Sequence, residues 1–305
     1  MRLPAPGPFT GLLIAALLAL CLGPVRAQTA EDRAPAPAAA ASEPARPATE
    51  LPEETPVPPR TARAWDAAIG AALGYAPGYA GAAAHKLRLL PGFYVRWQRI
   101  SFATRSAFVS RGSSAEAATF GGLRIDLSPS ERFRLTLGLR YDSGRDEDSS
   151  EELRGMGDIR GTVRLRLAAS APFAEVWRLG ATVSFDLQGR GGGHVGDVNL
   201  SRAIPWSDRT QMSLGLTYGL AGRRYMRSYY GVTPEQSART GYPVYEPGAG
   251  GRDVSLAFSA RSRLGGPWTA FYGVSASRVL GPAARSPLTR ERNGWGLQGG
   301  IVYRF

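Results

Sequence analysis

The sequence predicts a closed antiparallel transmembrane β-barrel of about twelve strands, which follows an export signal and a linker. Two observations support this fold class. Apolar residues recur at alternate positions in segments between Trp65 and Phe305, and the connections between these segments alternate between long and short. A strand between lipid and water shows such alternation, and outer-membrane barrels have long loops at one end and tight turns at the other.

The first 27 residues have the layout of a secretory signal peptide. Arg2 is followed by an apolar run over 11–23, and the small residue Ala27 lies at the expected cleavage point. The single cysteine of the chain, Cys21, falls inside the apolar run. We therefore expect residues 1–27 to be removed and the mature chain to contain no thiol.

Residues 28–64 are dominated by Ala, Pro, Glu and Arg and have almost no large aliphatic side chains. Such a segment cannot bury enough apolar area to offset the entropy lost on ordering. We expect a disordered periplasmic linker over 28–64, with the barrel over 65–305.

Composition excludes two other classes of protein. Beyond Ala27 there is no apolar stretch of the ~20 residues that a membrane-spanning helix needs, which excludes a helical membrane protein. The net charge of +12 and the pI of about 10.4 are compatible with nucleic-acid binding. However, an exported chain does not meet nucleic acid, and the arginines are spread singly along the strand-like segments, so we expect no nucleic-acid partner.

The segment 133–142 shows the alternation most clearly, because one face is wholly apolar and the other polar. The same pattern recurs at 178–187 and 211–220. Most segments are close to the ~9–11 residues that a tilted strand needs to cross the hydrocarbon layer. The predicted strands are 65–75, 85–97, 99–109, 115–127, 132–142, 157–169, 177–187, 195–204, 210–221, 252–263, 267–279 and 293–305.

The connections between these strands sort by length. Long connections at 143–156, 222–251 and 281–292 alternate with tight ones at 128–131, 205–208 and 264–266. Because outer-membrane barrels place their long loops outside the cell, we expect both termini in the periplasm and the barrel in the outer membrane of a Gram-negative cell.

The last predicted strand ends in Tyr303, Arg304 and Phe305, with Trp295 and Leu297 on the same face as the two aromatic residues. A terminal Phe after alternating aromatics is the signal that the barrel-assembly machinery reads. We therefore take Tyr303 and Phe305 as an insertion signal, and expect outer-membrane lipid and lipopolysaccharide as surroundings.

Arginines and aspartates lie on the polar phase of the strands. An Arg that faces lipid near the bilayer midplane costs ~2–4 kcal/mol, so we expect these side chains to point into the lumen. A paired, water-containing interior fits either a plugged core or a narrow channel that tolerates anions. The predicted lumen-lining charges are Arg88, Arg96, Arg134, Arg140, Asp142, Arg164, Arg166, Asp186, Asp253, Arg261 and Arg304.

Catalysis is disfavoured by the residues present. The two histidines, His85 and His194, fall at strand boundaries and have no Ser or Asp at a spacing that suggests a triad. The Gly-rich segment 189–194 follows a strand without a helix to bind phosphate, and reads as a flexible loop. The acidic run over 146–152 lacks the spacing of a calcium loop. We therefore expect the protein to have no enzymatic activity, no cofactor and no metal site.

Three stretches resemble the MipA/OmpV family of outer-membrane proteins. The most specific is YYGVTPEQSARTGYPVY at 229–245, and the others are SRVLGPAARSPLT at 277–289 and LGYAPGYAG at 73–81. The resemblance makes the first stretch a signature loop and a possible partner contact. Its residues taken as that contact are Tyr229, Tyr230, Gly231, Val232, Thr233, Pro234, Glu235, Gln236, Ser237, Gly241 and Tyr245.

The resemblance also implies a function. It suggests a non-catalytic scaffold that holds a lytic transglycosylase and a murein synthase together. Other members of the family are linked to osmotic response, adhesion or small-molecule passage. A small pore or a surface adhesin therefore stay open as alternatives.

Overall fold

The computed structural model describes residues 65–104, 121–129, 133–174 and 176–305. The expected signal peptide and linker lie outside these residues. The chain divides into two compact units, 1–58 and 59–305, and all described residues belong to the second.

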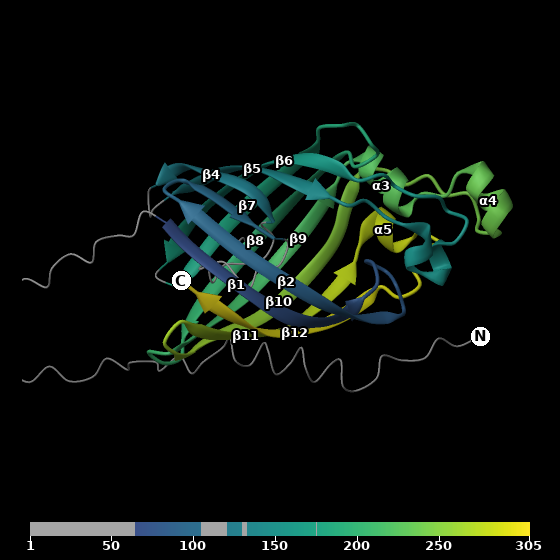
Figure 1. Cartoon of the computed structure of the whole chain (residues 1–305). Helices are drawn as coiled ribbons and strands as arrows, with labels where there is room; N and C mark the ends of the chain where they lie inside the picture. Colours follow the sequence, from purple (N-terminus) through teal and green to yellow (C-terminus); the bar gives the residue numbers. More distant parts are fainter. Residues whose placement is uncertain (1–64, 105–120, 130–132, 175) are drawn as a thin grey trace, which may run out of the picture. The chain divides into compact units, whose positions relative to one another are not determined.

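Within the described residues, twelve antiparallel strands form a closed barrel, which confirms the predicted fold class (Figure 1). Each strand pairs with its neighbours in the sequence, and β1 pairs with β12 to close the sheet. The strands are β1 (Trp65–Pro77), β2 (His85–Trp97), β3 (Ile100–Ala103), β4 (Gly122–Pro129), β5 (Arg134–Asp142), β6 (Thr162–Ala174), β7 (Trp177–Asp186), β8 (His194–Pro205), β9 (Thr210–Ala221), β10 (Gly250–Gly265), β11 (Trp268–Val279) and β12 (Asn293–Arg304).

Three predicted strands differ from the observed ones by more than two residues at one or both ends. The predicted strand at 115–127 is observed as β4, and residues 115–120 lie outside the described part of the chain. The predicted strand at 157–169 is β6, which begins five positions later than expected, at Thr162. Its predicted start was wrong because Gly155 and Gly157 have positive φ angles of 79° and 75°, and Met156 between them is buried among loop residues. The predicted strand at 99–109 is observed as β3, and residues 105–120 lie outside the described part of the chain.

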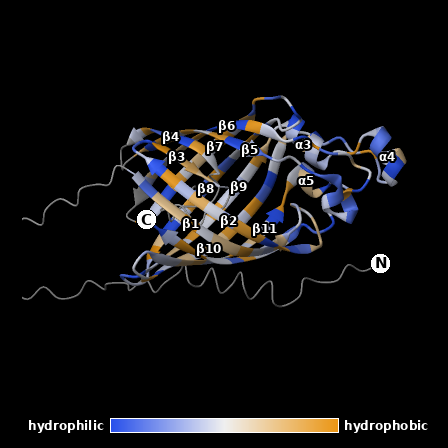
Figure 2. Cartoon of the chain, viewed as in Figure 1, coloured by the Kyte–Doolittle hydropathy of each residue, from blue (hydrophilic) through white to orange (hydrophobic). Residues whose placement is uncertain are grey.

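Alternate residues of each strand face opposite sides of the wall. On β9, Leu216 and Tyr218 are 45% and 42% exposed, whereas Ser213 and Gly219 on the other phase are buried. Figure 2 shows hydrophobic and hydrophilic residues alternating along the strands. Large apolar side chains that are exposed over the whole outer wall need an apolar solvent, which is the lipid of a membrane.

The helices lie in the long connections, at one end of the barrel (Figure 1). We call this the long-loop end. It holds the connections at 78–84, 143–161, 187–193, 222–249 and 280–292, with α3 (Arg223–Tyr230), α4 (Pro234–Thr240), α5 (Gly281–Ala284) and the 3-10 turns η2 (Glu147–Ser149) and η3 (Glu151–Leu153). In the described part of the chain, no helix is long and apolar enough to cross a membrane.

The opposite end has tight connections at 98–99, 206–209 and 266–267, and we call it the short-turn end. Trp65 at the start of β1 and Phe305 after β12 both lie there (Figure 1). The two ends of the barrel therefore differ, because one carries folded loops and the other carries turns and the chain ends of the barrel.

Aromatic side chains mark the two edges of the outer wall. At the long-loop end, Trp295 lies beside His85, with ring centroids 4.6 Å apart. At the short-turn end, Tyr303 contacts Trp268 and Phe305 edge-on, with both centroid distances at 5.1 Å. About 26 Å of strand separates Trp295 from Tyr303, and strand tilt reduces this to about 20 Å along the barrel axis. This height is close to the ~25 Å apolar band of outer-membrane barrels.

Candidate functional site

The lumen is lined by ion pairs, and Arg164 on β6 is the centre of the first group. Its Nε donates to Asp142 Oδ2 on β5 at 2.8 Å, and its Nη2 donates to the backbone oxygen of Gly192 at 2.7 Å. The Arg164 side chain is only 6% exposed. A nearly buried guanidinium needs such partners, because an unpaired charge away from water is costly.

Arg252 on β10 forms the second group. Its Nη2 donates to Asp197 Oδ1 at 3.0 Å, and its Nε donates to Asp253 Oδ2 at 2.9 Å. The register between β9 and β10 shifts between Gly251 and Asp253, so Arg252 is the extra residue of a β-bulge. Strict alternation assigns Arg252 to the outer face, which is why the sequence prediction missed it. The glycines at the start of the strand are the signal that indicates a bulge.

The third group lies at the closing seam near the short-turn end. Arg304 Nη1 on β12 donates to both carboxylate oxygens of Asp66 on β1, at 2.9 and 2.8 Å. This pair joins the first strand to the last. The sequence prediction included Arg304 but not Asp66, because the alternation in β1 is carried mostly by alanines and glycines.

The structure also locates the remaining predicted lumen charges. Each occupies the phase of its strand that carries the ion pairs described above, as the strand registers show. Asp186 accepts hydrogen bonds from Thr162 and from the backbone nitrogen of Gly192. The charges on this inward phase are Arg88, Arg96, Arg134, Arg140, Arg166, Asp186, Asp253 and Arg261.

Helix α3 enters the mouth of the lumen at the long-loop end. The Tyr225 ring lies 5.7 Å from the Arg164 guanidinium carbon and 5.9 Å from that of Arg252. Tyr229, one turn later, stacks on Tyr225 with a centroid distance of 4.3 Å. Both contacts are favourable, since a guanidinium is attracted to an aromatic face and residues four apart are neighbours on a helix. The long connection therefore folds into the mouth and places an aromatic pair over the charged lumen.

The other side of α3 packs against apolar residues. Met226 is fully buried, together with Tyr230, Val279 and Ala283. Ser286 Oγ donates to the Tyr230 backbone oxygen at 2.6 Å and links α3 to the next connection. We call the packed connections 143–161, 222–249 and 280–292 the cap.

Helix α3 packs directly on the Gly-rich segment 189–193. Gly193 has a positive φ of 51°, and an added Cβ would lie 2.7 Å from the backbone nitrogen of Tyr225. The backbone nitrogen of Gly222 donates to the His194 oxygen at 3.0 Å. An added Cβ at Gly222 would lie 2.2 Å from His194 Nε2. The glycines therefore provide a close approach for the helix, a role that the sequence did not indicate.

Replacing Gly193 with valine is expected to loosen the cap. The left-handed backbone costs a β-carbon residue about 1–2 kcal/mol, and the clash with Tyr225 adds to this cost. We expect limited proteolysis within 222–249 to be roughly tenfold faster than in the wild type. Gly248→Val is the control, because an added Cβ there meets nothing within 4 Å. Equal cleavage rates for Gly193→Val and the wild type would contradict the role of Gly193 in the packing of α3.

The signature loop forms the outer layer of the cap. Val232 is buried with Leu153, Met156 and Leu288, which come from two other connections. Gln236 completes a capping box with Thr233 at the start of α4, and its Nε2 donates to the Met156 oxygen at 2.5 Å. These contacts assign a packing role to the inner part of the loop.

The signature residues therefore separate by exposure. Tyr245 Oη donates to the Pro282 oxygen at 2.8 Å, which holds the end of the loop to the connection at 280–292. Residues exposed on the surface are the ones that a partner can contact. Tyr230, Gly231 and Val232 are buried, Tyr229, Gln236, Ser237 and Tyr245 are partly buried, and Thr233, Pro234, Glu235 and Gly241 are exposed.

Burial raises the pKa values of four tyrosines at the long-loop end, Tyr79, Tyr225, Tyr229 and Tyr230. Burial raises the pKa of Tyr79 to about 12, with a smaller contribution from the Glu152 carboxylate. Burial also raises the pKa of Tyr229 to about 12, and the Asp142 carboxylate adds to the shift. Tyr79 Oη donates to the Leu288 oxygen at 2.8 Å, which requires the protonated phenol.

This shift predicts how the cap responds to alkali. Because the folded cap favours the neutral phenols, their contribution to stability is complete below pH 10 and is lost as the pH rises through about 12. In an absorbance titration of tyrosinate, we expect a late-ionising fraction that Tyr79→Phe and Tyr229→Phe each reduce. The urea-unfolded chain is the control, where all tyrosines titrate near ~10. A folded barrel whose tyrosines all ionise near that pH would contradict the burial.

The histidines have packing roles in the structure. The His85 ring packs against the Tyr75 and Trp295 rings on the outer wall, and its Nε2 is 3.2 Å from the Trp295 oxygen. His194 packs on Gly222 below α3. Among the described residues, no group of three or more His, Cys, Asp or Glu side chains has a geometry that holds a metal ion.

The acidic run supports local turns in the cap. Asp146 Oδ1 accepts from the Asp148 nitrogen at 2.8 Å, and Glu147 Oε2 accepts from the Gly157 nitrogen at 2.8 Å. Lys86 on β2 donates to the Ser149 oxygen. These contacts hold the connection at 143–161 in place beside the barrel wall.

Comparisons with known proteins add a family to this geometry. The family model of the MltA-interacting protein MipA matches residues 69–305. No match was found among the curated proteins. The barrel is similar to the solved structure of the NanC porin, with 9% identity, 77% of this chain and 98% of that chain covered, and a TM-score of 0.40. Similar values hold for the KdgM porin (10%, 78%, 99% and 0.37) and for the anion-selective porin from Comamonas acidovorans (8%, 79%, 98% and 0.35).

Proposed function

The chain belongs to the MltA-interacting protein MipA family and is an outer-membrane β-barrel, and from this premise we propose that it acts as a non-catalytic anchor for murein-remodelling enzymes. The enzymes are a lytic transglycosylase, the class that the family name indicates, and a murein synthase. The family match over nearly the whole barrel is the observation that carries this proposal.

The geometry favours the short-turn end as the anchoring surface. Long loops face outside in outer-membrane barrels, so this orientation directs the short turns and Trp65 to the periplasm, where murein lies. In the sequence, residues 28–64 directly precede Trp65. In this orientation the signature loop faces the exterior. We therefore assign the enzyme contacts to the turns and to residues 28–64, and not to 229–245.

A pair of site-specific crosslinks tests this assignment. A photo-crosslinking side chain replaces Asp208, which is exposed in a short turn, or Glu235, which is exposed on the cap. After irradiation of intact cells, we expect Asp208 to capture a lytic transglycosylase or a murein synthase. Glu235 serves as the control at the opposite end. Capture from Glu235 alone, or no murein enzyme from either position in a folded barrel, would overturn the proposal.

A small pore is the second candidate, and the charged lumen favours it. Gln298 is exposed on the inward phase of β12, and ion pairs line the wall, so the interior holds water. The cap covers one mouth of this interior. Planar-bilayer recording distinguishes the two functions: the anchor predicts background conductance with the cap intact, whereas steady conductance in the wild type would favour the pore.

A further inference from the structure

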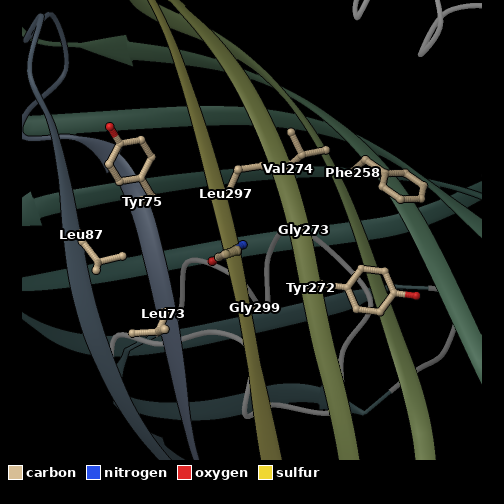
Figure 3. A pocket seen from close by; sticks show the side chains of 10 residues that line it. Leu73, Tyr75, Leu87, Phe258, Tyr272, Gly273, Val274, Leu297 and Gly299 are labelled. Carbon is tan, nitrogen blue, oxygen red and sulfur yellow. The ribbon is translucent and has the colours of Figure 1, made fainter.

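An apolar groove crosses the outer face of the barrel wall where the first and last strands meet (Figure 3). Its volume is about 480 Å³. The groove runs over β1, β2, β10, β11 and β12. Gln298, on the inward phase of β12, also borders it, and the other side chains that line it lie on the outward phase of their strands. The main ones are Leu73, Leu87, Phe258, Tyr272, Val274 and Leu297.

The groove exists because Gly299 occupies an outward position between Leu73 and Tyr272. An added Cβ at Gly299 would lie 3.7 Å from the Phe271 oxygen, which is an ordinary contact. The backbone therefore accepts a side chain at this position. The groove is present because residue 299 is a glycine. Neither a turn nor a close approach of two strands requires glycine at this position.

A basic rim lies above the groove at the long-loop end. Arg278 follows Val274 on the outward phase of β11, about 13 Å further along the strand, and it donates to Asn293 Oδ1. Strand tilt reduces this distance to about 10 Å along the barrel axis, which is half of the ~20 Å apolar height given above. Arg278 thus lies where a headgroup begins when an acyl chain fills the groove. Two further arginines, Arg285 and Arg292, are exposed in the connection that follows β11.

We propose that this wall binds one lipid A molecule, with an acyl chain in the groove and a phosphate at Arg278. The proposal rests on the orientation given above, which places the long-loop end in the lipopolysaccharide leaflet. A groove between two aromatic edges is immersed in hydrocarbon, so its occupant is apolar, and the basic rim requires an anionic headgroup. A second copy of the chain fits less well, because a two-fold contact brings the two basic rims together.

Native mass spectrometry of the purified barrel in detergent, with added bisphosphorylated lipid A, tests this site. We expect the wild type to retain one lipid A, and Gly299→Leu to reduce the retained fraction about tenfold by filling the groove. Arg278→Gln is expected to remove the preference for bisphosphorylated over monophosphorylated lipid A. The control is Ala181→Leu, which places the same leucine side chain at an exposed outward position on β7.

Each other outcome contradicts the site. Equal retention by Gly299→Leu and Ala181→Leu would show that lipid A binds elsewhere, and equal retention of phosphatidylglycerol would show that the rim does not select lipid A. A barrel that retains a second copy of itself instead of lipid would assign the groove to a dimer. The crosslinking test at Asp208 does not depend on Gly299. Failure of the lipid A site can therefore be distinguished from failure of the anchor proposal.

Discussion

Arg164→Ala is expected to destabilise the folded barrel by about 3 kcal/mol and to release the cap from the lumen. The substitution leaves the Asp142 carboxylate without its 2.8 Å partner and the Gly192 oxygen without a donor. It also removes the cation from one face of Tyr225, which weakens the hold on α3. We expect a lower urea midpoint in lipid vesicles and bilayer conductance above that of the wild type.

Arg134→Ala is the matched control for this experiment. Arg134 lies on the inward phase of β5 near the short-turn end and is exposed, so its loss removes the same charge without touching the cap. We expect its stability and conductance to stay close to those of the wild type. If both variants behave alike, the Arg164 network has no special role in holding α3.

Leu216→Arg is expected to cost about 2–4 kcal/mol, because it places a guanidinium in hydrocarbon near the middle of β9. Leu216 is 45% exposed on the outward phase, midway between the two ends of the strand. The urea midpoint in vesicles should fall accordingly, and less folded barrel should accumulate in the outer membrane.

Gln298→Arg provides the comparison on the inner face. Gln298 is exposed in the lumen on β12, where water solvates a new charge. The added arginine should change stability by much less than in Leu216→Arg. A larger loss for Gln298→Arg than for Leu216→Arg would reverse the assignment of the two faces.

Periodicity predicted the wall of the barrel because each strand lies between two solvents. On β9 every second residue must suit lipid and the others must suit water. The residue types of Leu216 and Thr217 therefore predict which side of the wall each faces, without any tertiary information. The strand pairings follow from sequence order once the sheet closes. The same argument located Arg164 on the inner face.

The cap was not predictable in the same way. Tyr225 is positioned by Arg164 and Arg252, which come from strands far away in the sequence, and no period connects them. Arg252 itself was not predicted as a lumen residue because a β-bulge interrupts the alternation. The resemblance made the signature loop a possible partner contact, but the sequence does not distinguish a Val232 that is buried in a cap from one that is exposed at an interface.

The central claim is that the wall separates lipid outside from water inside, residue by residue. Spin labels on single cysteines test it directly, because the one native cysteine, Cys21, lies in the expected signal peptide. A scan over 211–220 in bilayers measures collision with oxygen, which partitions into lipid, and with a water-soluble nickel complex. The account predicts oxygen maxima at even positions and nickel maxima at odd positions throughout β9. Uniform values, or the opposite phase, would contradict it.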